Sequence, residues 1–215
     1  MTHSWDLVKQ TINQTMILVP HRGESDYRQW RDWFLAGLQK PPGTGFLEIR
    51  GLSLTTSRTK LVMEALKTTA QYFFFLDDDL IGPDDALLTM LGYQLPIVSG
   101  LYMAKKRKEE RGLAAWMKVQ DDPPGYLPID PKQNGRFAQV DVIGLGCCLL
   151  HRSIFERLSQ PWFEWKVDGV SEDFYLFDKV SSELGIKPML DMELGFSHIG
   201  TFLLDTDGSF TTLEK

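Results

Sequence analysis

The stretch Tyr72-Phe73-Phe74-Phe75-Leu76-Asp77-Asp78-Asp79-Leu80 decides the fold. Its aromatic and apolar first half is typical of a β-strand that is buried on both faces, as in a parallel sheet. Ligands bind beyond the carboxyl ends of such strands. Adjacent carboxylates at that end repel one another, and a hard divalent cation with oxygen ligands would relieve the repulsion. Because side chains alternate along an extended chain, we expect Asp77 and Asp79 to share one direction and Asp78 to point away. The alternative is a solvated acidic turn.

Predicted strands and helices alternate around this stretch. Pro20 is expected to end the first strand, and Ser25 is expected to cap the first helix. The expected strands lie at residues 16–19, 46–49, 72–76, 96–100, 139–143, 147–150 and 187–190, with helices at 25–39 and 57–69 and others that start near 82, 153 and 171. This alternation predicts a single α/β domain over residues 1–215, with a mainly parallel central sheet flanked by helices and loose ends at 1–14 and 205–215.

The alternation stops at residues 104–137, which contain prolines, glycines and the basic cluster Lys105-Lys106-Arg107-Lys108. We expect a long, weakly structured excursion here, because long loops in compact domains are usually functional lids or disordered segments. The basic cluster is either a solvated stretch or an arm that faces the acceptor and meets phosphates.

Composition limits the class of protein. The 215 residues are 43% hydrophobic and 12% aromatic, which is enough for a substantial core. The net charge of -6 disfavours general nucleic-acid binding, which requires a basic face. Cys147 and Cys148 are neighbours, so we interpret them as buried thiols in a reducing compartment. No apolar run approaches the roughly 20 residues of a transmembrane helix, and no leader is visible, so we expect a cytoplasmic protein.

Four short motifs follow one another along the chain. They are the strand end Pro20-His21-Arg22, the aspartates 77–79, the acidic helix start Ser171-Glu172-Asp173-Phe174, and the late histidine His198. In this order, over about residues 15 to 203, they resemble the nucleotide-sugar glycosyltransferases of the GT-A fold, which are Rossmann-like and carry an Asp-x-Asp motif. The acidic helix start is also ordinary N-terminal helix chemistry, and a lone histidine is often structural.

The resemblance, which is of the family-2 type, implies transfer of a hexosyl-type sugar from a nucleoside-diphosphate sugar with Mn²⁺ or Mg²⁺. It assigns the metal to Asp77, Asp79 and His198. The residues that it places near the nucleotide are Pro20, His21, Arg22, Arg58, Asp77 and Asp78. Arg58, which is expected in the first turn of its helix, would meet the phosphates; the alternative for it is a surface ion pair.

On the acceptor side, the resemblance makes Asp173 the general base if the enzyme is inverting. Glu172 would orient the acceptor or support the helix. The family likeness also places Gly144, Gly146 and Trp162 toward the acceptor, and the interpretation of the basic cluster as an arm adds Lys105. The sequence does not name the acceptor, for which a glycan, a lipid, a protein and a modified nucleic-acid base are the alternatives.

Two other functions agree with the same residues. A sugar-nucleotide pyrophosphorylase, which is a nucleotidyltransferase, shares the architecture and the metal carboxylates, but it needs a glycine-rich basic loop where this chain has Pro20-His21-Arg22-Gly23. A non-catalytic carbohydrate- or nucleotide-binding module is the alternative from another class.

Overall fold

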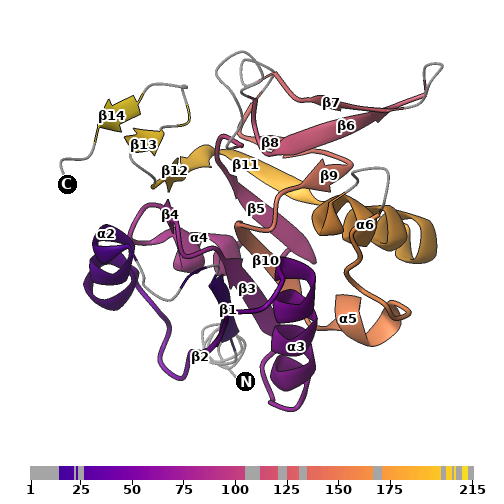
Figure 1. Cartoon of the computed structure of the whole chain (residues 1–215). Helices are drawn as coiled ribbons and strands as arrows, with labels where there is room; N and C mark the ends of the chain where they lie inside the picture. Colours follow the sequence, from indigo (N-terminus) through magenta and orange to yellow (C-terminus); the bar gives the residue numbers. More distant parts are fainter. Residues whose placement is uncertain are drawn as a thin grey trace, which may run out of the picture.

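The computed structural model describes residues 15–21, 23, 27–104, 112–120, 125–130, 135–166, 171–199, 202–204, 206 and 210–212. A seven-stranded sheet forms the centre, and helices cover both of its faces (Figure 1). Along the sheet the strands are β2 (Gly45–Arg50), β1 (Thr15–His21), β3 (Tyr72–Leu76), β10 (Cys147–His151), β5 (Ile97–Leu101), β11 (Met189–Gly195) and β8 (Phe137–Gln139).

The central sheet is mainly parallel, as the sequence predicts. β1 is parallel to β2 and β3, and β11 is parallel to β5. β10 is antiparallel to both of its neighbours, and β8 is antiparallel to β11. β3 lies inside the sheet with all of its residues buried, so the chain leaves the sheet interior directly into the three aspartates.

The side chains of β3 divide between two cores, as the two-residue period of a strand requires. Phe73 and Phe75 join the core under α3 (Leu54–Leu66), α5 (Ser153–Arg157) and α6 (Glu172–Lys179). Phe74 and Leu76 join the core under α2 (Arg28–Asp32), the π-helical turn η1 (Trp33–Gly37) and α4 (Ala86–Gly92). Full burial of each such side chain contributes about 1.5–3 kcal/mol, so this strand anchors both layers.

Two smaller sheets flank the central one. One contains β7 (Gly125–Pro128), β6 (Ala115–Val119) and β9 (Val142–Ile143). The other contains β14 (Phe210–Thr212), β13 (Phe202–Leu204), β12 (Ser197–His198) and β4 (Leu80–Ile81). α6 continues into the π-helical turn η3 (Val180–Leu184), which ends at Gly185 in the left-handed conformation (φ 67°) that favours glycine.

The expectation of a weakly structured excursion is wrong for the described part of residues 104–137. β6 and β7 form a hairpin there, and the rings of Trp116 and Tyr126 each lie 4.8 Å from the ring of Phe174 on α6. This aromatic packing holds the hairpin against α6. The charge and proline content of the segment did not predict a hairpin. The expected loose end at 205–215 is also partly wrong, because β14 pairs with β13.

Several boundaries differ from the sequence predictions. The strand expected at 139–143 divides into β8 and β9, which lie in different sheets, and α4 starts at Ala86 rather than near residue 82. β1 runs through Pro20 to His21; its pairing with β3 ends at Leu18, so the missing N–H of Pro20 costs no bond to that neighbour. The first helix starts at Arg28, and Ser25 lies outside the described residues. α3 starts earlier than expected because the Oγ atom of Ser53 caps it.

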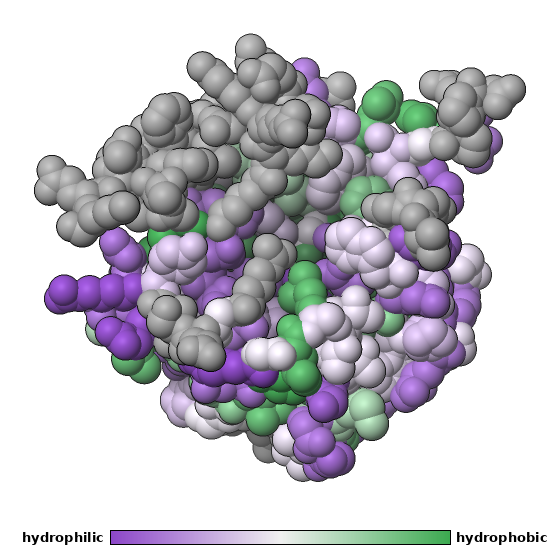
Figure 2. Space-filling model, in the orientation of Figure 1, coloured by the Kyte–Doolittle hydropathy of each residue, from purple (hydrophilic) through white to green (hydrophobic). Residues whose placement is uncertain are grey.

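The surface is mixed. Figure 2 shows hydrophilic side chains over much of the face seen in Figure 1, with separate apolar areas among them. None of the described helices is long and apolar enough to cross a bilayer. Both cysteines are buried free thiols, as expected.

Candidate functional site

The candidate site begins where β3 ends. Residues 78 and 79 form a turn, in which the N–H of Leu80 donates to the carbonyl of Asp77 at 3.3 Å. The extended geometry that underlies the alternation of Asp77 and Asp79 therefore stops at Leu76. Each of the three carboxylates faces a different partner, and these partners define three parts of the site.

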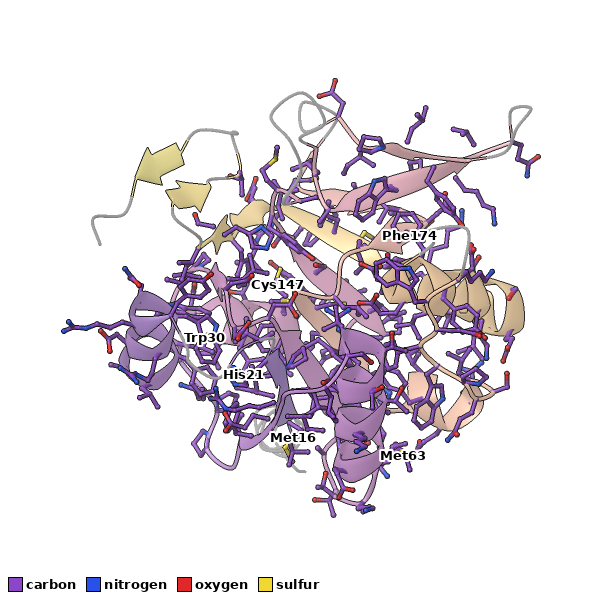
Figure 3. The ribbon with its side chains drawn as sticks, in the orientation of Figure 1. Met16, His21, Trp30, Met63, Cys147 and Phe174 are labelled. Atoms are coloured by element: carbon purple, nitrogen blue, oxygen red, sulfur yellow. The ribbon has the colours of Figure 1, made fainter. Side chains whose placement is uncertain are left out.

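Asp78 faces His21 at the end of β1. Its Oδ2 atom lies 3.0 Å from Nδ1 of His21, and Nε2 of the same ring lies 3.1 Å from Oε2 of Glu48 on β2. Both ring nitrogens donate only in the imidazolium form, which this pair of carboxylates fits. The ring is 2% exposed and lies edge-on to Trp30 (Figure 3). His21 thus ties two parallel strands to the aspartate turn.

Asp79 faces His198, which pairing with β4 brings to this edge. Nδ1 of His198 lies 2.6 Å from the carbonyl oxygen of Met103. Because a carbonyl only accepts, Nδ1 carries a proton, and Nε2 lies 3.8 Å from Oδ1 of Asp79. A backbone carbonyl that holds the second nitrogen is the usual support of a metal-binding histidine.

Asp77 faces Arg58, which lies in the second turn of α3 rather than the first. Nη2 of Arg58 lies 3.1 Å from Oδ1 of Asp77, and Nη1 donates to Oε1 of Glu172 at the start of α6. Arg58 and Glu172 are each 2% exposed. Burial disfavours the charged guanidinium, but the carboxylates of Asp77, Glu172 and Asp173 outweigh it and raise the pKa of Arg58. The structure therefore buries Arg58 among carboxylates. This differs from the surface ion pair that was the alternative for Arg58, and its guanidinium is not exposed toward a phosphate.

Glu172 and Asp173 differ in environment although they are neighbours. Burial raises the pKa of Glu172, Arg58 opposes that rise, and Asp173 and Asp77 add to it. Asp173 is partly exposed, and its Oδ1 atom accepts from the Ser171 hydroxyl and from the N–H of Phe174 at 3.2 Å. These two donors fix the orientation of the Asp173 carboxylate at the start of α6.

Tyr102 belongs to the site, and the sequence analysis missed it. Its hydroxyl accepts from the N–H of Gly146 at 3.1 Å, and its ring lies edge-on to His198 with centroids 5.2 Å apart. Burial, Cys147, Asp77 and Asp173 raise the pKa of Tyr102, so the phenol stays neutral. The sequence could have indicated Tyr102 as a site residue by its position, because it directly follows the carboxyl end of the buried strand β5.

Gly144 and Gly146 make room for Tyr102. A Cβ atom on Gly144 would lie 1.9 Å from the Tyr102 hydroxyl oxygen. A Cβ atom on Gly146 would lie 3.0 Å from that oxygen and 3.1 Å from Oδ2 of Asp77. Glycine is therefore needed at both positions because a larger residue would collide with Tyr102. A role of these glycines toward an acceptor stays a prediction.

Some predicted site residues lie elsewhere. Trp162 is 4% exposed, and its indole N–H donates to the carbonyl of Leu158 at 3.2 Å within the core, so the structure does not bring it to the aspartates. Pro20 is buried in β1. Arg22 and Lys105 lie outside the described residues. Among the residues that the structure describes, no group of three His, Cys, Asp or Glu side chains is gathered closely enough to hold a metal ion.

Comparisons with known proteins bear on the fold. No protein-family model and no curated protein matches the sequence. The crystal structure of A197 from STIV is similar over 94% of this chain and 95% of that chain, with 17% identity and a TM-score of 0.70. This similarity shows a shared fold.

Two further structures are similar at lower scores. The inositol-1-phosphate CTP transferase from T. maritima matches over 91% of this chain and 74% of its own, with 14% identity and a TM-score of 0.42. An apo UDP-glucose pyrophosphorylase matches over 86% and 76%, with 13% identity and a TM-score of 0.43.

Proposed function

We propose that the protein is a metal-dependent glycosyltransferase that moves a sugar from a nucleoside-diphosphate sugar to an acceptor hydroxyl. The observation that carries this proposal is a pair of contacts made by the aspartates that follow β3. Asp79 faces His198 at 3.8 Å, and Asp77 is joined through Arg58 to the helix start that bears Asp173.

Asp79 and His198 are the residues that would hold Mn²⁺ or Mg²⁺. The carbonyl of Met103 holds Nδ1 of His198, so Nε2, which faces Asp79, is the nitrogen that would bind the metal. Asp77 is engaged with Arg58, so we assign it a place beside the metal rather than in direct contact. A divalent ion held by these residues would offset the charge of a departing nucleoside diphosphate without proton transfer.

Asp173 is the proposed general base for an inverting transfer. Its carboxylate is partly exposed, and the Ser171 hydroxyl and the Phe174 N–H fix its orientation. An ionised carboxylate accepts the proton of the acceptor hydroxyl as the new glycosidic bond forms. Positioning supplies much of the effect of a base that is held in this way.

An assay of nucleotide sugars tests this proposal. The protein is incubated with a panel of uridine, guanosine and thymidine diphosphate sugars with Mn²⁺, and free nucleoside diphosphate is measured with water or added sugars as acceptors. Mn²⁺-dependent release of nucleoside diphosphate supports the glycosyltransferase.

A second arm adds pyrophosphate to the same mixtures. Formation of nucleoside triphosphate and sugar 1-phosphate would identify a nucleotidyltransferase instead. If neither reaction occurs but a nucleotide sugar raises the melting temperature, the protein is a binding module, because a ligand that binds only the folded state stabilises it.

A further inference from the structure

We infer that Arg58 and Glu172 form a buried positioning pair that holds Asp77 and Asp173 in a fixed relative position, and that Arg58 does not contact the phosphates of the donor. This inference rests on the proposed function, because Asp77 and Asp173 are parts of the proposed site. It adds positioning residues to that site and removes a phosphate ligand from it.

The contacts of Arg58 connect two parts of the chain that are far apart in sequence. One arm of the guanidinium reaches Asp77 after β3, 19 residues away, and the other reaches Glu172 at the start of α6, 114 residues away. The planar guanidinium keeps its donors at fixed angles, so its two carboxylate partners are held at a fixed separation. Asp173 follows Glu172 in the first turn of α6, so its backbone position is fixed with that of Glu172.

Burial excludes Arg58 from a direct role with phosphates. The side chain of Arg58 is 3% exposed, and that of Glu172 is 2% exposed. To reach a bound diphosphate, the guanidinium would have to leave Asp77 and Glu172, and Glu172 would then remain buried as an uncompensated charge. The burial and the two carboxylate contacts favour a fixed Arg58.

The pair is also a poor stabiliser of the fold. Nε of Arg58 and Oε2 of Glu172 are buried and have no hydrogen-bond partner among the described residues. Buried polar atoms without partners destabilise a fold, and buried ion pairs are weak contributors to stability. Local arrangements that cost stability are expected at functional sites. A role in placing the neighbouring carboxylates therefore explains the pair better than stability does.

The test separates positioning from stability with a double variant. Arg58→Met leaves Glu172 buried without its cation, and we expect its melting temperature to fall by about 10 °C. In Arg58→Met/Glu172→Gln the buried charge is gone, so most of that loss should be recovered. Both variants should lose about 100-fold or more in kcat with little change in donor KM, because small displacements of reacting groups have effects of this size.

Arg152→Met is the matched control. Arg152 donates to the carbonyls of Leu66, Thr68 and Ala70, near the opposite end of α3. Its loss should lower the melting temperature while kcat of the folded protein stays normal. An equal loss of kcat in this control would overturn the inference, because it would show that any weakening of α3 has the same effect.

Binding gives a readout that does not depend on turnover. Titration with Mn²⁺ and UDP, or GDP if the donor panel selects guanosine sugars, should give a Kd within about threefold of wild type for the double variant. A Kd raised about tenfold or more would show that the pair acts on binding of the metal and nucleotide, either directly or through Asp77, and would overturn the inference.

Turnover of the double variant is the other decisive result. Wild-type kcat in the stable double variant would reduce the pair to a structural role. An inactive wild-type protein would instead contradict the proposed function itself, so the two failures are distinguishable.

Discussion

His198 directs its Nε2 atom toward Oδ1 of Asp79 across 3.8 Å, while its other ring nitrogen is held by the carbonyl of Met103. The backbone, and not the aspartate, therefore sets the orientation of the ring. Asp79 and the imidazole face each other from two separate elements, β12 and the turn after β3.

We expect Asp79→Ala to abolish Mn²⁺-dependent release of nucleoside diphosphate without lowering the melting temperature. Loss of one of three adjacent carboxylates relieves repulsion in the metal-free protein. Asp85→Ala is the control, because Asp85 is an exposed acid at the start of α4 whose side chain makes no cap bond. Full activity of Asp79→Ala, or of the wild type in excess chelator, would exclude the metal role.

We expect Asp173→Asn to reduce transfer by about 100-fold or more, which is the usual effect of losing a general base. Binding of Mn²⁺ and nucleotide should persist. If Asp173 only caps the helix, the substitution should instead cost about 0.3–1 kcal/mol of stability and leave transfer normal. Melting temperature and transfer rate measured on one sample separate these outcomes.

The pH dependence of Glu172→Gln relative to wild type follows from the raised pKa of Glu172. The folded state then holds a proton that the unfolded state has already lost, so ionisation of Glu172 destabilises the fold as pH rises from its ordinary value of 4.5. Glutamine carries no such penalty. We therefore expect the free energy of unfolding of Glu172→Gln, relative to wild type, to increase as the pH rises above the ordinary Glu pKa of 4.5. A flat difference in urea titrations would contradict this.

We expect Gly144→Ala to destabilise the protein by about 1–3 kcal/mol, because the added methyl group meets the Tyr102 hydroxyl. The cost should be smaller in a Tyr102→Phe background, where that oxygen is absent. Gly125→Ala in β7 is the control, since a Cβ atom there has no heavy atom within 4 Å. Equal costs of Gly144→Ala in both backgrounds would show that the contact with the hydroxyl is not the cause.

The β6–β7 hairpin should respond to ligands. We predict that residues 104–137 exchange amide hydrogens more slowly when Mn²⁺ and a nucleotide sugar are bound, since closure over a site excludes water. Hydrogen exchange that does not change with ligand would contradict a lid.

Phe174→Ala should speed amide hydrogen exchange in the β6–β7 hairpin, because Phe174 packs against both Trp116 and Tyr126.

Local sequence was sufficient to predict the framework. The apolar run before Asp77 predicted β3 and its burial, and the alternation of strands and helices predicted the mainly parallel sheet. The predicted strand and helix boundaries were wrong where they rested on one residue without knowledge of which strands lie beside it. Pro20 was expected to end a strand, but at that point β1 pairs with β2 alone.

The partners of the aspartates could not be predicted in the same way. The alternation rule for Asp77 and Asp79 assumes an extended chain, and the turn at residues 78–79 removes that assumption. The contact of Arg58 with Glu172 spans 114 residues and depends on how α3 and α6 pack, which no short window of sequence contains. Tyr102 was missed because a single tyrosine has no motif.

The position of β10 governs the order in which the molecule can assemble. β10 lies between β3 and β5, although it follows both by many residues in the chain. A nascent chain that has emerged only through β5 therefore presents two open strand edges at what will become the middle of the sheet. Open edges of this kind recruit other chains, so the growing polypeptide has its greatest need of chaperones in that interval.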